Sequence, residues 1–129
     1  MKISLAGVRH SQGGQSYVTN GIVLDMTSYS RVLHLNSSTR IITVESGATW
    51  EHVQAAANQV NLAVEVMQSS NIFTIGGSLS VNAHGRDPHY GSMIDSTVGF
   101  RLLTYDGIVK NVSRQENSQL FDLVIGGYG

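Results

Sequence analysis

Two glycine-rich stretches carry the residues best suited to binding chemistry in this sequence. The first covers residues 7–15 (GVRHSQGGQ), and the second covers residues 74–85 (TIGGSLSVNAHG). Glycine lets the backbone approach a ligand closely, and successive backbone N–H groups can surround an anion without any lysine. Two such loops could therefore hold one pyrophosphate group between them. The alternative is that both stretches only form tight turns.

Neither stretch matches a common nucleotide-binding motif. The sequence contains no Gly-Lys-Ser or Gly-Lys-Thr, which the P-loop requires, and no Gly-x-Gly-x-x-Gly of the dinucleotide-binding fingerprint. The glycine-rich stretches alone therefore leave the nature of the ligand open.

Other kinds of catalytic chemistry have little support in the sequence. The absence of cysteine excludes thiolate nucleophiles and thiolate metal ligands. Ser11 and Ser78 do not lie in the Gly-x-Ser-x-Gly pattern of a hydrolase nucleophile. His84 and His89 match no standard metal-ligand spacing, so we predict no metal site. His34 and His52 are expected to have structural roles, whereas His10 and His84 lie inside the glycine-rich stretches.

The composition indicates one globular domain that does not bind nucleic acid. The chain has 129 residues, 41% of them hydrophobic, and a net charge of -1, so the basic footprint of a phosphate-backbone binder is missing. No apolar run approaches the roughly 20 residues that cross a bilayer, and the N-terminus lacks a secretory apolar region. We expect a soluble, cytoplasmic protein without a membrane span.

Short apolar runs separated by turn residues predict a framework of strands. These runs are Ile3–Ala6, Gly21–Met26, Ser30–Leu35, Arg40–Glu45, Val98–Tyr105 and Ile108–Val112, with a short extended piece at Ala63–Met67. Asp106-Gly107 predicts a hairpin between the last two strands.

Two helices are expected among these strands. Thr49 can cap a helix over Trp50–Gln59, whose apolar residues recur at spacings of three and four. Trp50 is expected to lie in the core. A second helix is expected over Gln119–Ile125.

Taken in order, several segments resemble the FAD-binding domain of the vanillyl-alcohol oxidase/p-cresol methylhydroxylase type. The resemblance runs from Ile3 to Gly129 and depends on the order of segments that are each weak alone. The segments that carry it are Gly7–Gly14, Gly21–Met26, Thr43–Trp50, Thr74–Gly85, Tyr90–Asp95, Thr104–Gly107 and Leu120–Phe121. The resemblance implies an α+β fold, a PCMH-type domain with a mixed sheet and flanking helices.

The resemblance also implies the residues that contact FAD. Gly7–Gly14 and Thr74–Gly77 would hold the pyrophosphate, and Val81–His84 would lie along the flavin or the ribityl chain. The full set is Gly7, Val8, Arg9, His10, Ser11, Gln12, Gly13, Gly14, Ser69, Thr74, Ile75, Gly76, Gly77, Val81, Asn82, Ala83, His84, Ser92 and Val98. His10 stands where some members carry a histidine joined covalently to the flavin; the alternative is a hydrogen bond to the pyrophosphate. No catalytic base can be assigned.

The resemblance implies an FAD-dependent oxidoreductase. Asn82–His89 and Gly91-Ser92 look most like the sugar and aldonolactone oxidases and decaprenylphosphoryl-ribose oxidase. We therefore expect hydride transfer to FAD from a C–OH group of a sugar- or polyol-like substrate. Two alternatives are a domain of the UDP-N-acetylenolpyruvoylglucosamine reductase type and a flavin-free interaction module.

The resemblance further leads us to expect that residues 1–129 form a partial FAD-binding domain, inactive alone. Members of the family begin with a further strand-helix unit and continue into a substrate domain. The substrate, the electron acceptor and the oligomeric state are not determined by the sequence.

Overall fold

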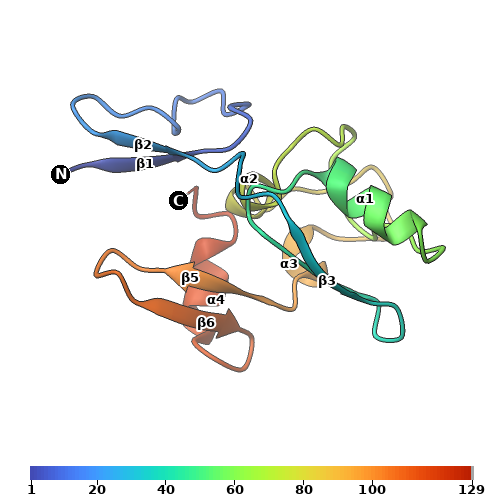
Figure 1. The fold of residues 1–129 in the computed structure, drawn as a ribbon. Helices are drawn as coiled ribbons and strands as arrows, with labels where there is room; N and C mark the ends of the chain where they lie inside the picture. Colours follow the sequence, from blue (N-terminus) through green and yellow to red (C-terminus); the bar gives the residue numbers. More distant parts are fainter. Residues whose placement is uncertain (129) are drawn as a thin grey trace.

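A computed structural model describes residues 1–128 and contains both helices and strands (Figure 1). The elements in chain order are β1 (Ile3–Ala6), β2 (Ile22–Asp25), β3 (Val32–Asn36), β4 (Ile41–Val44), α1 (Trp50–Asn58), α2 (Ile75–Ser80), α3 (Met93–Ser96), β5 (Gly99–Leu103), β6 (Val109–Ser113) and α4 (Ser118–Val124). The expected α+β class is confirmed.

The strands of residues 1–128 pair in three separate two-stranded sheets. β1 and β2 are parallel, whereas β3–β4 and β5–β6 are antiparallel. The parallel and antiparallel pairings expected of a mixed sheet are therefore both present, but they are divided among separate pairs. The hairpin predicted at Asp106-Gly107 is confirmed, because Gly107 donates a backbone hydrogen bond to Thr104 at 2.9 Å between β5 and β6.

Parallel pairing of β1 with β2 determines where the first glycine-rich stretch lies. A parallel pair needs a long crossover between the end of one strand and the start of the next. Residues 7–21 form this crossover, which here contains no helix. The stretch therefore leaves the sheet at the carboxyl end of β1, beside the end of β2.

Two hydrophobic clusters form the core, and α2 contacts both. The first contains buried Trp50, as predicted, together with buried residues of α3 and the loops. The second surrounds Phe121 of α4 and Val112 of β6. Leu79 of α2 packs against both clusters. The short helix α2, near the centre of the molecule in Figure 1, therefore joins the two halves of the core.

The two central short helices were not expected from the sequence. α2 contains two glycines, which have low helix propensity, and α3 is a single turn. α2 forms because Thr74 caps it and because Ser78 is fully buried within the fold. The extended piece expected at Ala63–Met67 is wrong in detail, because no strand pairing forms there and the segment is irregular.

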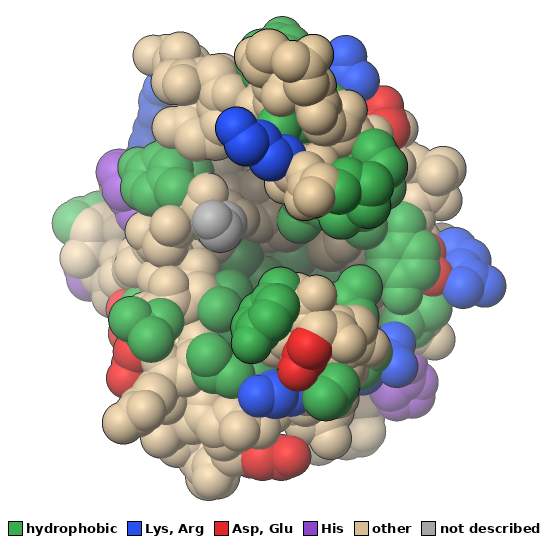
Figure 2. All heavy atoms as spheres, turned by 90° about the vertical axis from the view of Figure 1, so that its left-hand side faces the viewer, with side chains coloured by type: hydrophobic (Ala, Val, Ile, Leu, Met, Phe, Trp, Pro, Cys, Tyr) green, Lys and Arg blue, Asp and Glu red, His purple; other side chains and the backbone are tan. Residues whose placement is uncertain are grey.

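One face of the molecule exposes apolar side chains from two sheets. Figure 2 shows this face hollowed between the β1–β2 sheet above and the β5–β6 sheet below. Leu5 of β1 and Leu103 of β5 are 60% and 66% exposed. Within residues 1–128, no helix has the length and hydropathy needed to cross a membrane.

Candidate cofactor site

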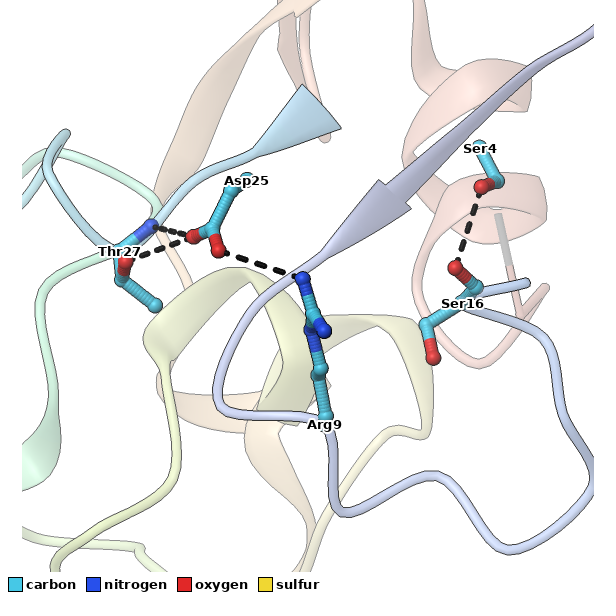
Figure 3. Close-up of polar contacts among 5 residues, drawn as sticks. All are labelled: Ser4, Arg9, Ser16, Asp25 and Thr27. Carbon is cyan, nitrogen blue, oxygen red and sulfur yellow. Dashed lines mark hydrogen bonds and ion pairs between the residues drawn. The ribbon is translucent and has the colours of Figure 1, made fainter. Parts of the chain in front are cut away.

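The first glycine-rich stretch is a loop that is anchored at its far end. The backbone N–H of Tyr17 donates to the Gly14 carbonyl at 2.9 Å. The Ser4 hydroxyl, from the middle of β1, donates to the carbonyl of buried Ser16 at 3.2 Å (Figure 3). These two bonds fix where the loop ends, while residues 7–14 project from the sheet.

The backbone donors of this loop are open. Within residues 1–128, none of the N–H groups of residues 7–14 donates a hydrogen bond to a backbone or side-chain acceptor. These residues are exposed or half-buried. A run of unpaired N–H groups on a glycine-rich loop is the donor set that a phosphate or pyrophosphate accepts from.

The structure brings the beginnings of the two glycine-rich stretches into contact. A Cβ on Gly7 would lie 2.4 Å from Oγ1 of Thr74, so a larger residue there would force Thr74 to move. The ring of His10 lies edge-on against Phe73, with ring centroids 5.0 Å apart. The two stretches expected to share one pyrophosphate are thus neighbours in space.

The second stretch differs from the first because the N–H groups at the start of α2 are already satisfied. The N–H of Ile75 donates to the Ala48 carbonyl and that of Gly76 to the Ser46 carbonyl, both at 2.7 Å. The N–H of Gly77 donates to Oγ1 of Thr74 at 3.3 Å. The glycines predict a close approach of the backbone to a neighbouring group, and at Gly76 this neighbour is the protein's own turn at Ser46.

The turn at residues 45–48 supports the first residues of α2 by accepting their N–H hydrogen bonds. A Cβ on Gly47 would lie 1.7 Å from the Met26 carbonyl oxygen, so the turn lies directly against the chain that follows β2. Glu45, 3% exposed, accepts hydrogen bonds from Arg31 Nε at 2.9 Å and Nη2 at 2.6 Å. Hydrogen bonds from the Arg31 guanidinium hold the pKa of Glu45 below its usual range.

A buried polar network fixes α2 from the side of α1. Trp50 Nε1 donates to Gln68 Oε1 at 2.7 Å and to Ser78 Oγ at 3.0 Å. Ser78 Oγ in turn donates to Gln68 Oε1 at 2.9 Å. Ser78 is therefore a structural residue, and its lack of a hydrolase motif agrees with this role.

The segment expected along the flavin follows α2 directly. Asn82 has a left-handed backbone with φ of 46°, and its Oδ1 accepts from the N–H of Ile94 at 3.0 Å. Buried Ala83 accepts from the N–H of Met93 at 2.8 Å. His84 forms an isolated bridge with Ser92. Asn82, Ala83, His84 and Ser92 are thus held together, while Val81 is 42% exposed.

The two candidate histidines are exposed and available for contact. Nδ1 of His10 lies 3.0 Å from the Val8 carbonyl, so an Nδ1–H tautomer donates there and leaves the Nε2 lone pair free. Nδ1 of His84 lies 2.8 Å from the Gly85 carbonyl. His89 instead pairs with Asp87 at 2.8 Å.

Two remaining candidates lie outside the contact between the stretches. Ser69 is exposed, and Val98, the residue before β5, is 60% exposed. Val98 and Ile75 line a groove of about 1650 Å³, to which residues 7–14 contribute nothing. The sequence-based grouping of these side chains in one site stays a prediction.

One contact of the first loop was not expected from the sequence. Arg9 Nη2 lies 3.5 Å from Oδ2 of Asp25, the last residue of β2 (Figure 3). Asp25 Oδ1 accepts from the N–H of Thr27 at 3.0 Å and from its hydroxyl at 2.6 Å. Hydrogen bonds from Thr27 hold the pKa of Asp25 below its usual range. The Asp-x-Thr pattern, typical of a side-chain-stabilised turn, was a sequence signal for the Asp25–Thr27 contact but not for the contact with Arg9.

Comparisons with known proteins identify the family and the fold of the chain. The family described as FAD binding domain matches residues 1–113. Decaprenylphosphoryl-beta-D-ribose oxidase of Mycolicibacterium smegmatis is 30% identical over 125 residues, which is 95% of this chain and 27% of that protein.

Solved structures show the same fold. 6-Hydroxy-D-nicotine oxidase from Arthrobacter nicotinovorans matches with a TM-score of 0.87 and 26% identity, over 96% of this chain and 27% of that chain. A carbohydrate oxidase from Microdochium nivale matches with a TM-score of 0.85 and 25% identity, over 97% of this chain and 27% of that chain.

These matches favour the first sequence-based interpretation over its alternatives, the reductase-type domain and the flavin-free module. The chain spans little more than a quarter of the length of each protein. The chain belongs to the FAD-binding domain family and has the fold of FAD-linked oxidases of the vanillyl-alcohol oxidase/p-cresol methylhydroxylase type.

Proposed function

We propose that this chain binds FAD through the first glycine-rich loop and serves a flavin-dependent oxidoreductase. The observation that carries the proposal is the run of open N–H donors at residues 7–14, placed against Thr74 and Phe73. Donors of this kind fit a diphosphate, because they supply partial positive charge to an anion without a bulky side chain. The family match indicates that the diphosphate belongs to FAD.

The second stretch would act mainly as the wall of the site. Its first N–H groups bond to the carbonyls of Ala48 and Ser46, which keeps α2 in place beneath the loop. Contacts from Thr74–Gly77 to FAD would therefore come through other atoms or through local rearrangement. Val81–His84, next along the chain, would lie along the flavin or the ribityl chain.

His10 is our candidate for a covalent link to the flavin. The ring is exposed, it lies on the loop that would bind FAD, and the tautomer that donates to Val8 leaves Nε2 as a free nucleophile. A hydrogen bond from His10 to the pyrophosphate is the alternative. The two possibilities differ in whether acid releases the cofactor.

For the whole protein we propose oxidation of a C–OH group on a sugar- or polyol-like substrate. FAD supplies the redox chemistry when bound, accepting a hydride from the substrate carbon while the hydroxyl loses its proton. The names of a ribose-derivative oxidase and a carbohydrate oxidase among the similar proteins support a sugar-type substrate. The similarity to an oxidase of 6-hydroxy-D-nicotine shows that the fold also serves other substrates.

The first experiment measures flavin absorbance before and after acid precipitation of protein produced with added FAD. We expect yellow protein. Colour in the pellet that moves to the supernatant in His10→Ala, but not in His89→Ala, would support a link through His10. Colour in the supernatant for the unaltered chain would indicate non-covalent FAD, and failure to bind FAD at all would contradict the proposed function.

The substrate proposal needs a separate experiment on the whole protein. Under anaerobic conditions, a sugar-type alcohol should bleach the flavin absorbance, and its deoxy analogue should not. Bleaching by both compounds, or by neither, would contradict a C–OH group of this class as the site of oxidation.

A further inference from the structure

Arg9 holds an unusual conformation in the loop that we assign to the diphosphate. Its φ is 59°, in the left-handed region that residues other than glycine adopt at a cost. It is the single lysine or arginine of residues 7–16. A residue in this conformation persists only when its surroundings hold it there.

The side chain of Arg9 contacts the carboxylate of Asp25. Arg9 Nη2 lies 3.5 Å from Asp25 Oδ2, and Figure 3 shows the guanidinium directed at the end of β2. Both side chains are 52% exposed, so the pair is open to water and can respond to a ligand.

The position of Asp25 is itself determined by the sheet and by the turn after it. Ala6 and Asp25 are paired in the parallel register, and the N–H of Met26 donates to the Ala6 carbonyl at 2.8 Å. The two hydrogen bonds from Thr27 then hold Oδ1, which leaves Oδ2 for Arg9. The carboxylate thus stands on a rigid support opposite the start of the loop.

The loop has a second tie at its other end. The Ser4 hydroxyl holds the Ser16 carbonyl, so the chain between these points is fastened near both ends. Between the ties, no backbone N–H of residues 7–14 donates within the described part of the chain. The shape of this segment therefore depends on the two ties, together with the contact of His10 with Phe73.

We propose that Asp25 is a positioning residue for cofactor binding: by pairing with Arg9 it holds the loop in the shape that presents its N–H groups to the diphosphate of FAD. This inference rests on the proposed function. Fixing a loop in its bound shape reduces the ordering cost of binding. Pairing with Arg9 also neutralises the Asp25 carboxylate, which would otherwise repel the diphosphate.

The test compares Asp25→Asn with Asp106→Asn. The first substitution keeps a side-chain oxygen for Thr27 but removes the charge that attracts Arg9. Asp106 is a matched control, because its carboxylate also accepts a hydrogen bond from a threonine hydroxyl, that of Thr104, in the β5–β6 hairpin. The dissociation constants of FAD and of ADP are measured by titration. The signal is the fluorescence of Trp50, the only tryptophan. ADP carries the diphosphate without the flavin.

We expect Asp25→Asn to bind both FAD and ADP about three- to fivefold more weakly, the scale of one exposed ion pair. Asp106→Asn should bind both like the unaltered chain. The melting temperature of Asp25→Asn should stay close to that of the unaltered chain, which separates positioning from loss of fold.

A double-mutant cycle adds a second test. Arg9→Gln should weaken binding more, about tenfold, because it also removes the only cation of the loop. Adding Asp25→Asn to Arg9→Gln should weaken binding no further and should tighten it slightly, because the pair is already broken and the unpaired carboxylate no longer repels the diphosphate.

Several results would overturn the role of Asp25. Equal affinities for Asp25→Asn and the unaltered chain would do so. Tighter binding by Asp25→Asn would do so too, since Asp25 would then compete with the diphosphate for Arg9. Failure of the unaltered chain to bind FAD would instead contradict the proposed function itself.

Discussion

The two glycine-rich stretches look alike in sequence but differ in how their backbone groups are used. In residues 7–14 the N–H groups have no acceptor within residues 1–128, whereas Ile75 and Gly76 donate to carbonyls of the 45–48 turn. The first stretch is an open loop between two ties, and the second begins a helix that joins both hydrophobic clusters. A run of glycines can thus prepare a ligand site or permit close packing of the protein against itself.

The largest expected effect comes from breaking the support of the second stretch. In Gly47→Ala the new Cβ would lie 1.7 Å from the Met26 carbonyl oxygen and 2.7 Å from that of Tyr29, both backbone atoms. We expect the free energy of unfolding to fall by about 4 kcal/mol or more. Urea denaturation followed by Trp50 fluorescence measures this change.

Gly13→Ala is the matched change in the open loop. Its Cβ would lie 2.6 Å from Nε2 of Gln15, the end of a flexible side chain that can move away. We expect a change in stability within about 0.5 kcal/mol. Similar losses for Gly47→Ala and Gly13→Ala would contradict the contrast between the stretches.

A smaller effect is expected from one serine in each stretch. Ser78→Ala removes a fully buried hydroxyl that bonds to Trp50 and Gln68. It should cost about 1–2 kcal/mol of unfolding free energy. Ser11→Ala, on the exposed loop, should change stability by less than about 0.5 kcal/mol. Thermal unfolding measures both changes. An equal loss of stability from the two substitutions would contradict a structural role for Ser78 that Ser11 lacks.

The smallest expected effect is the contribution of Glu45 to the pH dependence of the melting temperature. Because Arg31 lowers the pKa of Glu45 in the folded chain, the Glu45 contribution is complete above its unfolded value of about 4.3. It is lost as pH falls through the lower folded value. We expect the melting temperature of the unaltered chain to drop in this acidic range, and Glu45→Gln to lower it at neutral pH and flatten the drop.

Exposed Glu65 provides the control for the pH experiment. Glu65→Gln should leave the pH profile of the melting temperature unchanged. A profile for Glu45→Gln that parallels that of the unaltered chain would show that the Arg31–Glu45 pair does not support the 45–48 turn.

Much of the fold could be predicted from local sequence signals. The apolar run at Ile3–Ala6, the cap at Thr49 and Asp106-Gly107 each determine an element through neighbouring residues. α2 could not be predicted, because its glycines disfavour a helix and its stability comes from Ser46, Ala48 and Trp50, which are distant in sequence.

The candidate site was predictable to a similar extent. The glycine-rich stretches were visible, and the contact of Gly7 with Thr74 brings them together. Which stretch keeps its donors free was not visible, because this depends on the 45–48 turn. The pairing of Arg9 with Asp25 depends on the register of β1 with β2.

The most direct test of the central claim is residue-resolved amide hydrogen exchange with and without FAD. We expect fast exchange at residues 8–14 in the free chain and slowing by about tenfold or more with FAD. Ile75 and Gly76 should exchange slowly in both states. Unchanged exchange at residues 8–14 upon FAD binding would contradict the claim that this loop holds the diphosphate.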